Sequence, residues 1–320
     1  MAGAIAGTTI LRLRTGEDRL RVVAATVNNV CNLRCPHCYL QYAGPSGIMS
    51  DDVAQVLMDA TYDHLAVVGK EPLLDHASVA LCESLVTRAL STGKSASIIT
   101  NGFGLSKLSC EASKALAYVD VSFDGGPQTY GSYRLGAYAK LTRSVEAITR
   151  AGIRELNALH VLNNVTVHSI DDMMRVTEIA PFRYVMFSPY LVTRNFGENS
   201  VSEVPLTRIL SGLARSEAFR STASAVLVVD SLHLTRDGST AGSFLRDVAA
   251  AGLADQVRVI DRDPLEYGVI RITYDGWLLA PHDSIHPTDY AKLGRRIHEG
   301  EKLILSAAYD DMLRAFRRAA

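Results

Sequence analysis

Three cysteines lie close together near the start of this 320-residue chain: Cys31, Cys35 and Cys38. Thiolates are ligands for zinc and for iron–sulfur clusters. Because the intervals between the three are short, their side chains can turn toward a common centre. The segment supplies only three ligands, so one metal position stays open. The sequence therefore predicts a metal centre with an open coordination position.

A zinc site is the alternative interpretation, with His37 as the fourth ligand. Structural zinc sites favour two well-separated ligand pairs. His37 lies between Cys35 and Cys38, where its ring would have difficulty reaching the same ion. The spacing favours a cluster over zinc, and over three thiols with a purely structural role.

Three polar motifs occur further along the chain, each at the end of a predicted strand. They are Gly69-Lys70-Glu71-Pro72, Thr100-Asn101-Gly102 and Ser122-Phe123-Asp124-Gly125. Taken singly, each is also typical of an ordinary turn, and Asp124 suits an Asx-turn. Their order along the chain, after the cysteines, is more informative than any one of them.

The cysteine spacing, with His37 at the aromatic-type position before the last cysteine, resembles the radical S-adenosylmethionine (SAM) superfamily. The resemblance implies that the cysteines hold a 4Fe-4S cluster and that SAM chelates the open iron through its amino and carboxylate groups. An electron from the reduced cluster would then break the sulfonium bond, giving methionine and a 5′-deoxyadenosyl radical.

The resemblance also implies contacts to SAM from successive strands. The motif at Glu71 is similar to the family's Gly-Gly-Glu-Pro, with Lys70 in place of the second glycine. On the fifth strand, Asn157 or His160 could point into the barrel, although His160 equally suits a buried core position. The expected cofactor-binding residues are His37, Gly69, Lys70, Glu71, Asn101, Ser122, Asp124, Asn157, His160 and Ser188.

The elements that position these residues are six short apolar strands that alternate with helical segments. The strands are predicted at 21–27, 64–69, 95–101, 118–124, 156–162 and 184–190. Helices are expected after Ser50, after Asp75, over 138–150 and from Ser169, because capping residues and glycines bound them. Alternation of this kind predicts an α/β fold, a partial (β/α)6 TIM-like barrel whose first strand ends at the cysteines.

The regular alternation of predicted strands and helices ends near residue 220. This suggests three parts: a lead-in over 1–19, the core over 20–220, and a C-terminal α+β extension over 221–320 that covers the barrel mouth. The extension is expected to hold a strand at 225–230, a helix at 240–252, a hairpin at 269–279 and a helix at 303–318. No cysteine follows Cys110. We therefore expect one cluster and no auxiliary cluster.

A second group of reactive side chains follows Trp277. His282, Asp283, His286 and Tyr290 gather in one loop, which we interpret as a substrate lid carrying catalytic residues, with a capped surface loop as the alternative. Cys82 and Cys110 are expected to be small core or surface residues, with Cys82 as a hydrogen donor a minor alternative.

Composition limits the classes of molecule that the chain is expected to bind. The formal net charge is −1 and the pI is about 6.8, so the chain lacks the basic field that nucleic acid binding needs. No apolar run reaches the ~20 residues of a membrane span. The N-terminal stretch reads poorly as a signal peptide, and the odd number of cysteines, five, favours a cytoplasmic protein. The expected partners are a small-molecule substrate or short peptide, and an electron donor such as flavodoxin or ferredoxin.

We therefore expect hydrogen abstraction from a small polar natural product, such as a sugar, nucleoside or amino-acid derivative, for epimerisation, elimination or rearrangement. The enzymatic alternative is cross-linking or epimerisation of a ribosomally made peptide. The nonenzymatic alternative is a metal-binding module.

Overall fold

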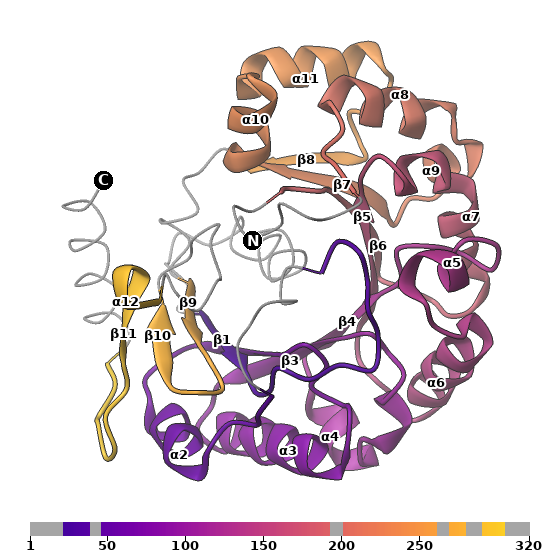
Figure 1. The fold of residues 1–320 in the computed structure, drawn as a ribbon. Coiled ribbons are helices and arrows are strands. Elements are labelled where there is room, and N and C mark those ends of the chain that lie inside the picture. The colour runs from indigo at the N-terminus through magenta and orange to yellow at the C-terminus, as the bar shows by residue number, and fades with distance from the viewer. Residues whose placement is uncertain (1–21, 39–45, 193–200, 261–268, 280–289, 305–320) are drawn as a thin grey trace.

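A single curved sheet organises the computed structural model, which describes residues 22–38, 46–192, 201–260, 269–279 and 290–304. The strands in chain order are β1 (Val22–Thr26), β2 (His64–Val68), β3 (Ser95–Thr100), β4 (Tyr118–Ser122), β5 (Leu156–Leu162), β6 (Tyr184–Pro189), β7 (Ala225–Asp230), β8 (Val257–Ile260), β9 (Val269–Ile272), β10 (Trp277–Leu279) and β11 (Gly294–Arg296). Their order in the sheet is β11-β10-β9-β1-β2-β3-β4-β5-β6-β7-β8. Figure 1 shows this sheet curving into a partial barrel.

Strands β1 to β8 pair in parallel, each with the next. On the other side of β1, β9 is also parallel, whereas β10 and β11 run antiparallel to their neighbours. In a parallel barrel the carboxyl ends of all the strands lie at one rim, where the loops of an active site are built. The loop after β1, which carries the cysteines, therefore lies at that rim.

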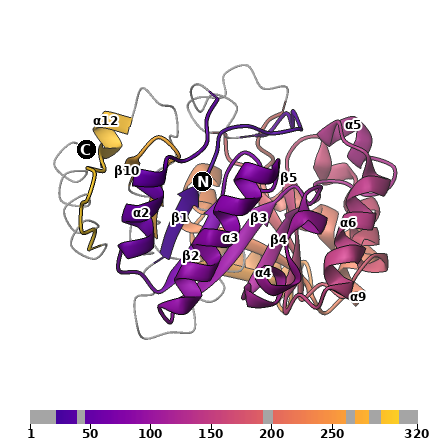
Figure 2. The ribbon, with the colours of Figure 1, turned by 90° about the horizontal axis from the view of Figure 1, so that it is seen from below.

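Helices connect the parallel strands and cover the outer face of the sheet; Figure 2 shows α2, α3 and α4 over the first strands. Two predicted N-caps are confirmed, because the Ser50 hydroxyl accepts from the Val53 amide at 3.4 Å and the Asp75 carboxylate from Ser78 at 2.9 Å. The helices are α2 (Asp51–Asp59), α3 (His76–Ser91), α4 (Cys110–Ala115), α5 (Tyr130–Arg134), α6 (Tyr138–Arg150), α7 (Ile170–Met174), α8 (Leu206–Arg215), α9 (Glu217–Ser221), α10 (Ser231–Asp237), α11 (Ala241–Ala250) and α12 (Tyr290–Leu293).

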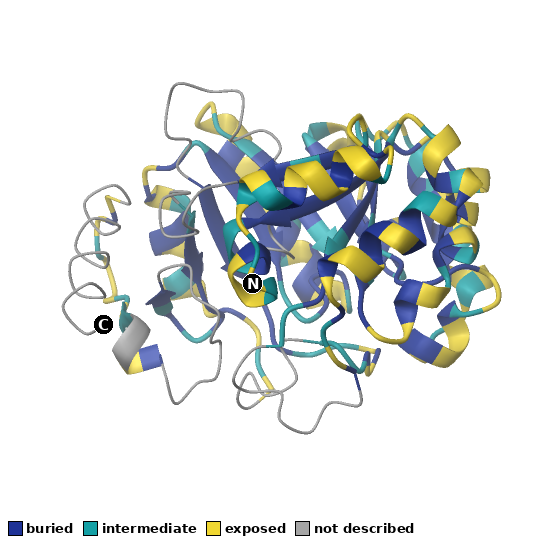
Figure 3. Ribbon diagram, turned by 90° about the horizontal axis from the view of Figure 1, so that it is seen from above, coloured by how far each residue is buried: buried dark blue, intermediate teal, exposed yellow. Residues whose placement is uncertain are grey.

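Side chains alternate between the two faces of each strand, so the barrel has an outer core against the helices and an inner core. The outer core is the larger; Figure 3 shows the buried strands beneath helices whose exposed residues face outward. Two smaller apolar clusters occupy the inner face, and Val269 of β9 packs against both. The first residue of β9 therefore belongs to the barrel interior.

The six predicted strands are present, and their ends agree with the prediction to within two residues. The partial barrel is confirmed, but it is larger than six units, because β7 and β8 continue the parallel series. The predicted hairpin is also present: β9 and β10 pair across a turn at Gly276, whose φ of +83° suits glycine.

The sheet runs past residue 220 without interruption, and the division there stays a prediction. Residues 1–19 and most of the predicted helix at 303–318 lie outside the described residues. Within the described segments, no helix has both the length and the apolar character needed to span a membrane.

Candidate functional site

The cysteine loop leaves the carboxyl end of β1 and is tied to the loop after β2. The Asn28 side-chain amide donates to the Glu71 carbonyl at 2.8 Å and to the Ser78 hydroxyl at 3.0 Å. The Glu71 backbone amide in turn donates to the Val30 carbonyl at 3.0 Å. The loop is thus fixed to the barrel rim immediately before Cys31.

The three thiols lie in surroundings suited to metal-bound sulfur. Cys35 is buried, and Cys31 and Cys38 are half-buried. The Leu33 amide donates to the Cys31 sulfur at 3.3 Å, and the Asn101 side-chain amide approaches it at 3.7 Å. Burial raises the pKa of the Cys31 thiol, and that of Cys35 to about 11. Metal binding must therefore displace protons, as it does at cysteine ligands in general.

A 4Fe-4S cluster fits these residues. In a cubane cluster each thiolate binds a different iron, so three sulfurs need to surround a cluster rather than meet at one ion. Among the described residues, no three His, Cys, Asp or Glu side chains converge on a single ion position. The loop, its three thiols and the donors to the Cys31 sulfur are the features that would hold the cluster.

Glu71 joins the loops that follow β2 and β3. Its buried carboxylate accepts from the Thr100 hydroxyl at 2.5 Å, the Asn101 amide at 2.7 Å and the Leu73 amide at 3.0 Å. Burial raises the pKa of Glu71. The carboxylate already has three donors, so it acts in the described structure as a brace between the two predicted motifs.

Gly69 is required by close packing. A Cβ at this position would lie 2.9 Å from the Asn28 side-chain oxygen, which is shorter than real Cβ contacts. The next residue, Lys70, donates its backbone amide to the Asn28 carbonyl at 3.2 Å. The first glycine of the motif therefore keeps its role, and the lysine at the second position preserves the backbone contact to the cysteine loop.

Asp124 is the most constrained residue of the site. Its φ is +48°, in the left-handed region that few non-glycine residues adopt. Its buried carboxylate accepts from the Val161 amide at 2.6 Å and contacts Arg134 and the Nε2 atom of His37, the latter at 3.1 Å. Burial alone would raise the pKa of Asp124, but the interactions of its carboxylate with His37 and Arg134 outweigh burial, and the pKa is lowered. Asp124 therefore links β4 and β5 to the cysteine loop.

Arg134, at the end of α5, is a site residue that the sequence analysis missed. It is buried, and although burial opposes its charge, Cys35 and Asp124 raise its pKa. Arg134 therefore adds a permanent positive charge beside the cysteine loop. The preceding residue, Tyr133, stacks on the His37 ring with centroids 5.2 Å apart. The sequence feature that could have indicated Arg134 is its place in the segment that follows the Ser-x-Asp-Gly motif.

The remaining predicted SAM contacts divide between the two faces of the sheet. Asn157 shares the inner face with its partner Asp120, to which it donates at 2.9 Å. By alternation, Ser122 and Ser188 also lie on the inner face. His160 does not: its ring stacks on Phe187 of the outer core at 4.9 Å. Of the two alternatives for His160, the buried core position is the one observed: it comes three positions after Asn157 on the strand, an odd offset, and therefore lies on the opposite face.

The predicted catalytic group is only partly described. His282, Asp283 and His286 lie outside the described residues. Tyr290 is buried at the start of α12, and its ring meets the edge of Trp277 at 5.9 Å. Cys82 lies on the buried face of α3, in the outer core, where its thiol donates to the Pro72 carbonyl at 3.3 Å. This places Cys82 in the outer core, away from the interior where a hydrogen donor would act.

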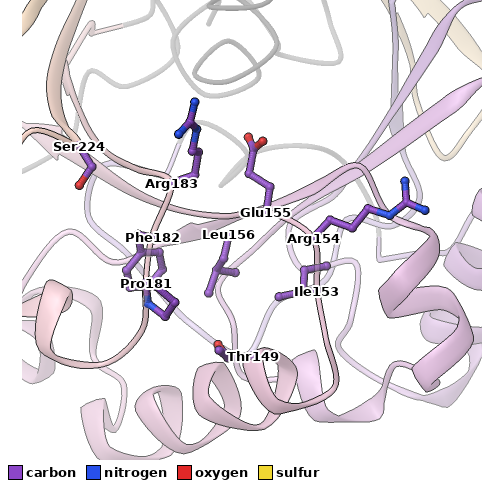
Figure 4. Close-up of a pocket in the computed structure, with 9 residues that line it drawn as sticks. All are labelled: Thr149, Ile153, Arg154, Glu155, Leu156, Pro181, Phe182, Arg183 and Ser224. Carbon is purple, nitrogen blue, oxygen red and sulfur yellow. The ribbon is translucent and has the colours of Figure 1, made fainter.

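A pocket of about 690 Å³ opens at the opposite end of the barrel. Its lining residues precede β5, β6 and β7 or begin β5, so they belong to the amino ends of the strands. Figure 4 shows Glu155 and Arg183 on the same side of the pocket and Arg154 directed away. Because the cysteines lie at the carboxyl ends, this pocket is separate from the cysteine site.

A family model described as the radical SAM superfamily matches residues 26–177, which include the cysteines and the motifs on β2, β3 and β4. Over these residues, just under half of its length, the chain matches the radical SAM superfamily. Pre-heme d1 synthase of Dinoroseobacter shibae is 31% identical over 143 residues, which cover 42% of this chain and 34% of that protein. The chain thus spans about a third of the length of this curated relative.

Solved structures show the same fold. SuiB of Streptococcus suis bound to its precursor peptide SuiA superposes with a TM-score of 0.69 at 12% identity, covering 98% of this chain and 70% of that chain. The SuiB structure bound to S-adenosylmethionine gives 0.66 at the same identity, covering 98% and 71%. The three predicted cluster ligands lie in the loop after β1, the first loop of this barrel.

Proposed function

We propose that the chain is an enzyme that cleaves SAM reductively and abstracts a hydrogen atom from a small polar substrate. The observation that carries the proposal is that the three polar motifs meet at the cysteine loop. Glu71 accepts from the Asn101 amide, Asn101 contacts the Cys31 sulfur, and Asp124 contacts His37. When bound, a 4Fe-4S cluster supplies the electron that splits SAM into methionine and the 5′-deoxyadenosyl radical.

The residues of this chain hold and orient the reactants. Cys31, Cys35 and Cys38 bind the cluster, and the donors from Leu33 and Asn101 stabilise the Cys31 thiolate. Buried Arg134 balances part of the negative charge that the thiolates bring. We propose that the inner-face residues Ser122, Asn157 and Ser188 contribute polar contacts to SAM.

The substrate proposed is a sugar, nucleoside or amino-acid derivative. Because no cysteine follows Cys110, we propose a single cluster, which leaves no auxiliary cluster to accept an electron. This supports a reaction without net oxidation, such as epimerisation, elimination or rearrangement. An external donor such as flavodoxin or ferredoxin would reduce the cluster.

A ribosomally made peptide is the second candidate substrate. The structure of SuiB, with which this chain shares its fold over 98% of its length, contains a bound precursor peptide. At 12% identity this likeness concerns the fold alone. Mass spectrometry of reactions run in heavy water with small polar substrates and with peptides would separate the two candidates by which one gains mass or forms a cross-link.

The test is anaerobic reconstitution with iron and sulfide. We expect about four irons per chain and 5′-deoxyadenosine that forms only with reductant and SAM. Cys31→Ser, Cys35→Ser and Cys38→Ser should each lose both signals. Cys110→Ser, at the exposed start of α4, is the matched control and should keep them. Bound zinc without cluster absorption would overturn the proposal in favour of a metal-binding module.

A further inference from the structure

Arg271 is an arginine on the inner face of the barrel. It is 9% exposed and lies in the middle of β9. Val269, two residues earlier, packs against both inner apolar clusters. Successive side chains alternate, so Arg271 shares the inner face with Val269. It occupies the next inner position toward the carboxyl end of the strand.

The pairing of β9 places Arg271 beside the strand that leads to the cysteines. Arg271 is the register partner of Ala24 on β1, and the two strands are parallel. Both strands therefore point toward the rim that holds the cysteine loop. Ala24 is a small inner-face residue, so it occupies less of the interior next to the guanidinium than a larger side chain would.

Aromatic side chains lie on the same face of the neighbouring strand. Leu279 of β10 is the antiparallel partner of Arg271, so Trp277, two residues away, shares this face. Tyr290 packs against both Leu279 and Trp277, and the guanidinium of Arg296 lies 5.0 Å from the Trp277 ring centre. Figure 1 shows β9, β10 and α12 close together beside β1. We call Arg271, Trp277 and Tyr290 the inner aromatic wall.

We propose that the inner aromatic wall binds an anionic group, a carboxylate or a phosphate, of the substrate. The inference rests on the proposed function and adds the chemical class of the substrate to it. A guanidinium is charged at every pH the protein meets, and its planar donors match carboxylate and phosphate geometry. It has five N–H donors, so it can hold an anion while it also contacts a neighbouring group.

The location favours a ligand over a purely structural role. Inner positions of a packed barrel strand are ordinarily apolar, and arginine is one of the residues least often buried. On the inner faces of β1 to β9 the arginines are Arg258, on β8, and Arg271. Arg258 uses its guanidinium to contact the Val257 carbonyl at 3.1 Å in its own strand. It therefore provides a matched control of the same residue type on the same face.

Trp277 makes binding directly measurable, because it is the single tryptophan of the sequence. The full-length chain is titrated with hippurate, a carboxylate, with phenyl phosphate, and with the neutral amide hippuramide, while Trp277 fluorescence is recorded. We expect a saturable change with hippurate or phenyl phosphate, or both, and none with hippuramide. The tighter of the two anions identifies the group. Arg271→Met should weaken that binding by about tenfold or more, and Arg258→Met should leave it unchanged.

Two results would overturn the inference. One is the absence of a saturable response to either anion, or an equal response to hippuramide. The other is loss of the SAM-dependent change in the electron paramagnetic resonance spectrum of the reconstituted Arg271→Met protein, which would mean that Arg271 serves SAM instead. If cluster formation and SAM cleavage fail in the unaltered protein while the anions still bind at Arg271, the proposed function fails and the anion site stands.

Discussion

The side-chain amide of Asn29 donates to the hydroxyl of Tyr274 at 3.0 Å, across 245 residues of sequence. Asn29 is buried two residues before Cys31, and its side-chain oxygen also accepts from the Gly47 amide at 2.7 Å. Tyr274 follows β9. The β9–β10 hairpin therefore braces the start of the cysteine loop directly.

We expect Tyr274→Phe to loosen this brace. The variant leaves one donor of a buried amide without this partner, which costs about 1–3 kcal/mol. With the reconstituted protein, iron should be lost to a chelator faster than from the unaltered protein, as followed by the visible absorption of the cluster. Tyr62→Phe, at a buried tyrosine whose ring packs beneath Lys94, is the control. Equal rates of loss in all three proteins would contradict the brace.

The Asp124–Arg134 pair gives a second prediction. Asp124→Asn keeps a residue type that tolerates the left-handed backbone but leaves Arg134 buried without its carboxylate. Breaking a buried pair on one side costs about 3–5 kcal/mol, measured as the free energy of unfolding in urea. The double variant Asp124→Asn/Arg134→Met should be less destabilised than the sum of the single variants. Additive losses would show that the two side chains do not act as a pair.

Replacing His160 with an apolar ring should stabilise the protein. Among the described residues neither of its ring nitrogens has a hydrogen-bond partner, and the ring stacks on Phe187. A buried polar group without a partner costs about 1–3 kcal/mol. His160→Phe should therefore raise the free energy of unfolding at neutral pH, whereas His76→Gln, at an exposed position, should not. A destabilised His160→Phe would show that the ring has a partner that matters.

His160 should also make the free energy of unfolding depend on pH. Burial lowers the pKa of His160 from 6.5 to about 4, so between these values the unfolded chain binds the proton and the folded chain does not. The free energy of unfolding then falls as the pH drops through this window, by up to about 1.4 kcal/mol per pH unit. The difference between the unaltered protein and His160→Phe should shrink on going from pH 4 to pH 7. An unchanged difference would contradict the assignment.

Gly69 allows a matched pair of glycine substitutions. Gly69→Ala would place a methyl group 2.9 Å from the Asn28 side-chain oxygen and should destabilise the protein by about 1–3 kcal/mol. Gly242→Ala lies in the first turn of α11, where an added Cβ meets nothing within 4 Å, so it should be neutral or stabilising by up to about 1 kcal/mol. Thermal unfolding of both variants would show whether Gly69→Ala lowers stability while Gly242→Ala leaves it unchanged or raises it.

The sequence was most informative where period-two apolar strands were bounded by glycine and polar residues. The limits of β5 and β7 agree with the prediction to the residue. It was less informative after residue 200, where α8, α9 and α10 and the four-residue strand β8 went unpredicted. The elements α9, α10 and β8 have too few residues for a period to show, and their conformation depends on tertiary packing. The ten-residue helix α8 is amphipathic, so its apolar spacing was a signal that could have predicted it.

The sequence predicted the motifs of the site but not the side-chain contacts that join them. The motifs placed Glu71, Asn101 and Asp124 at strand ends, because parallel strands end at one rim. They did not show that the Glu71 carboxylate braces two loops, or that Arg134 reaches Asp124. Both facts depend on side-chain contacts between elements far apart in sequence. His160 shows the remaining difficulty: a strand pattern fixes which residues share a face, but not which face is the interior.

The position of β1 between β2 and β9 has a consequence for synthesis. On the ribosome, the strand that leads to the cysteines gains its first parallel neighbour within about forty residues, but its second neighbour, β9, begins only at Val269. Until then one backbone edge of β1 stays unpaired, and such an edge can pair with other chains. Nascent chains that end before β9 should therefore aggregate more readily and hold iron less well than those that extend beyond Tyr274. Stable binding of the metal would then require that the hairpin has already been synthesised.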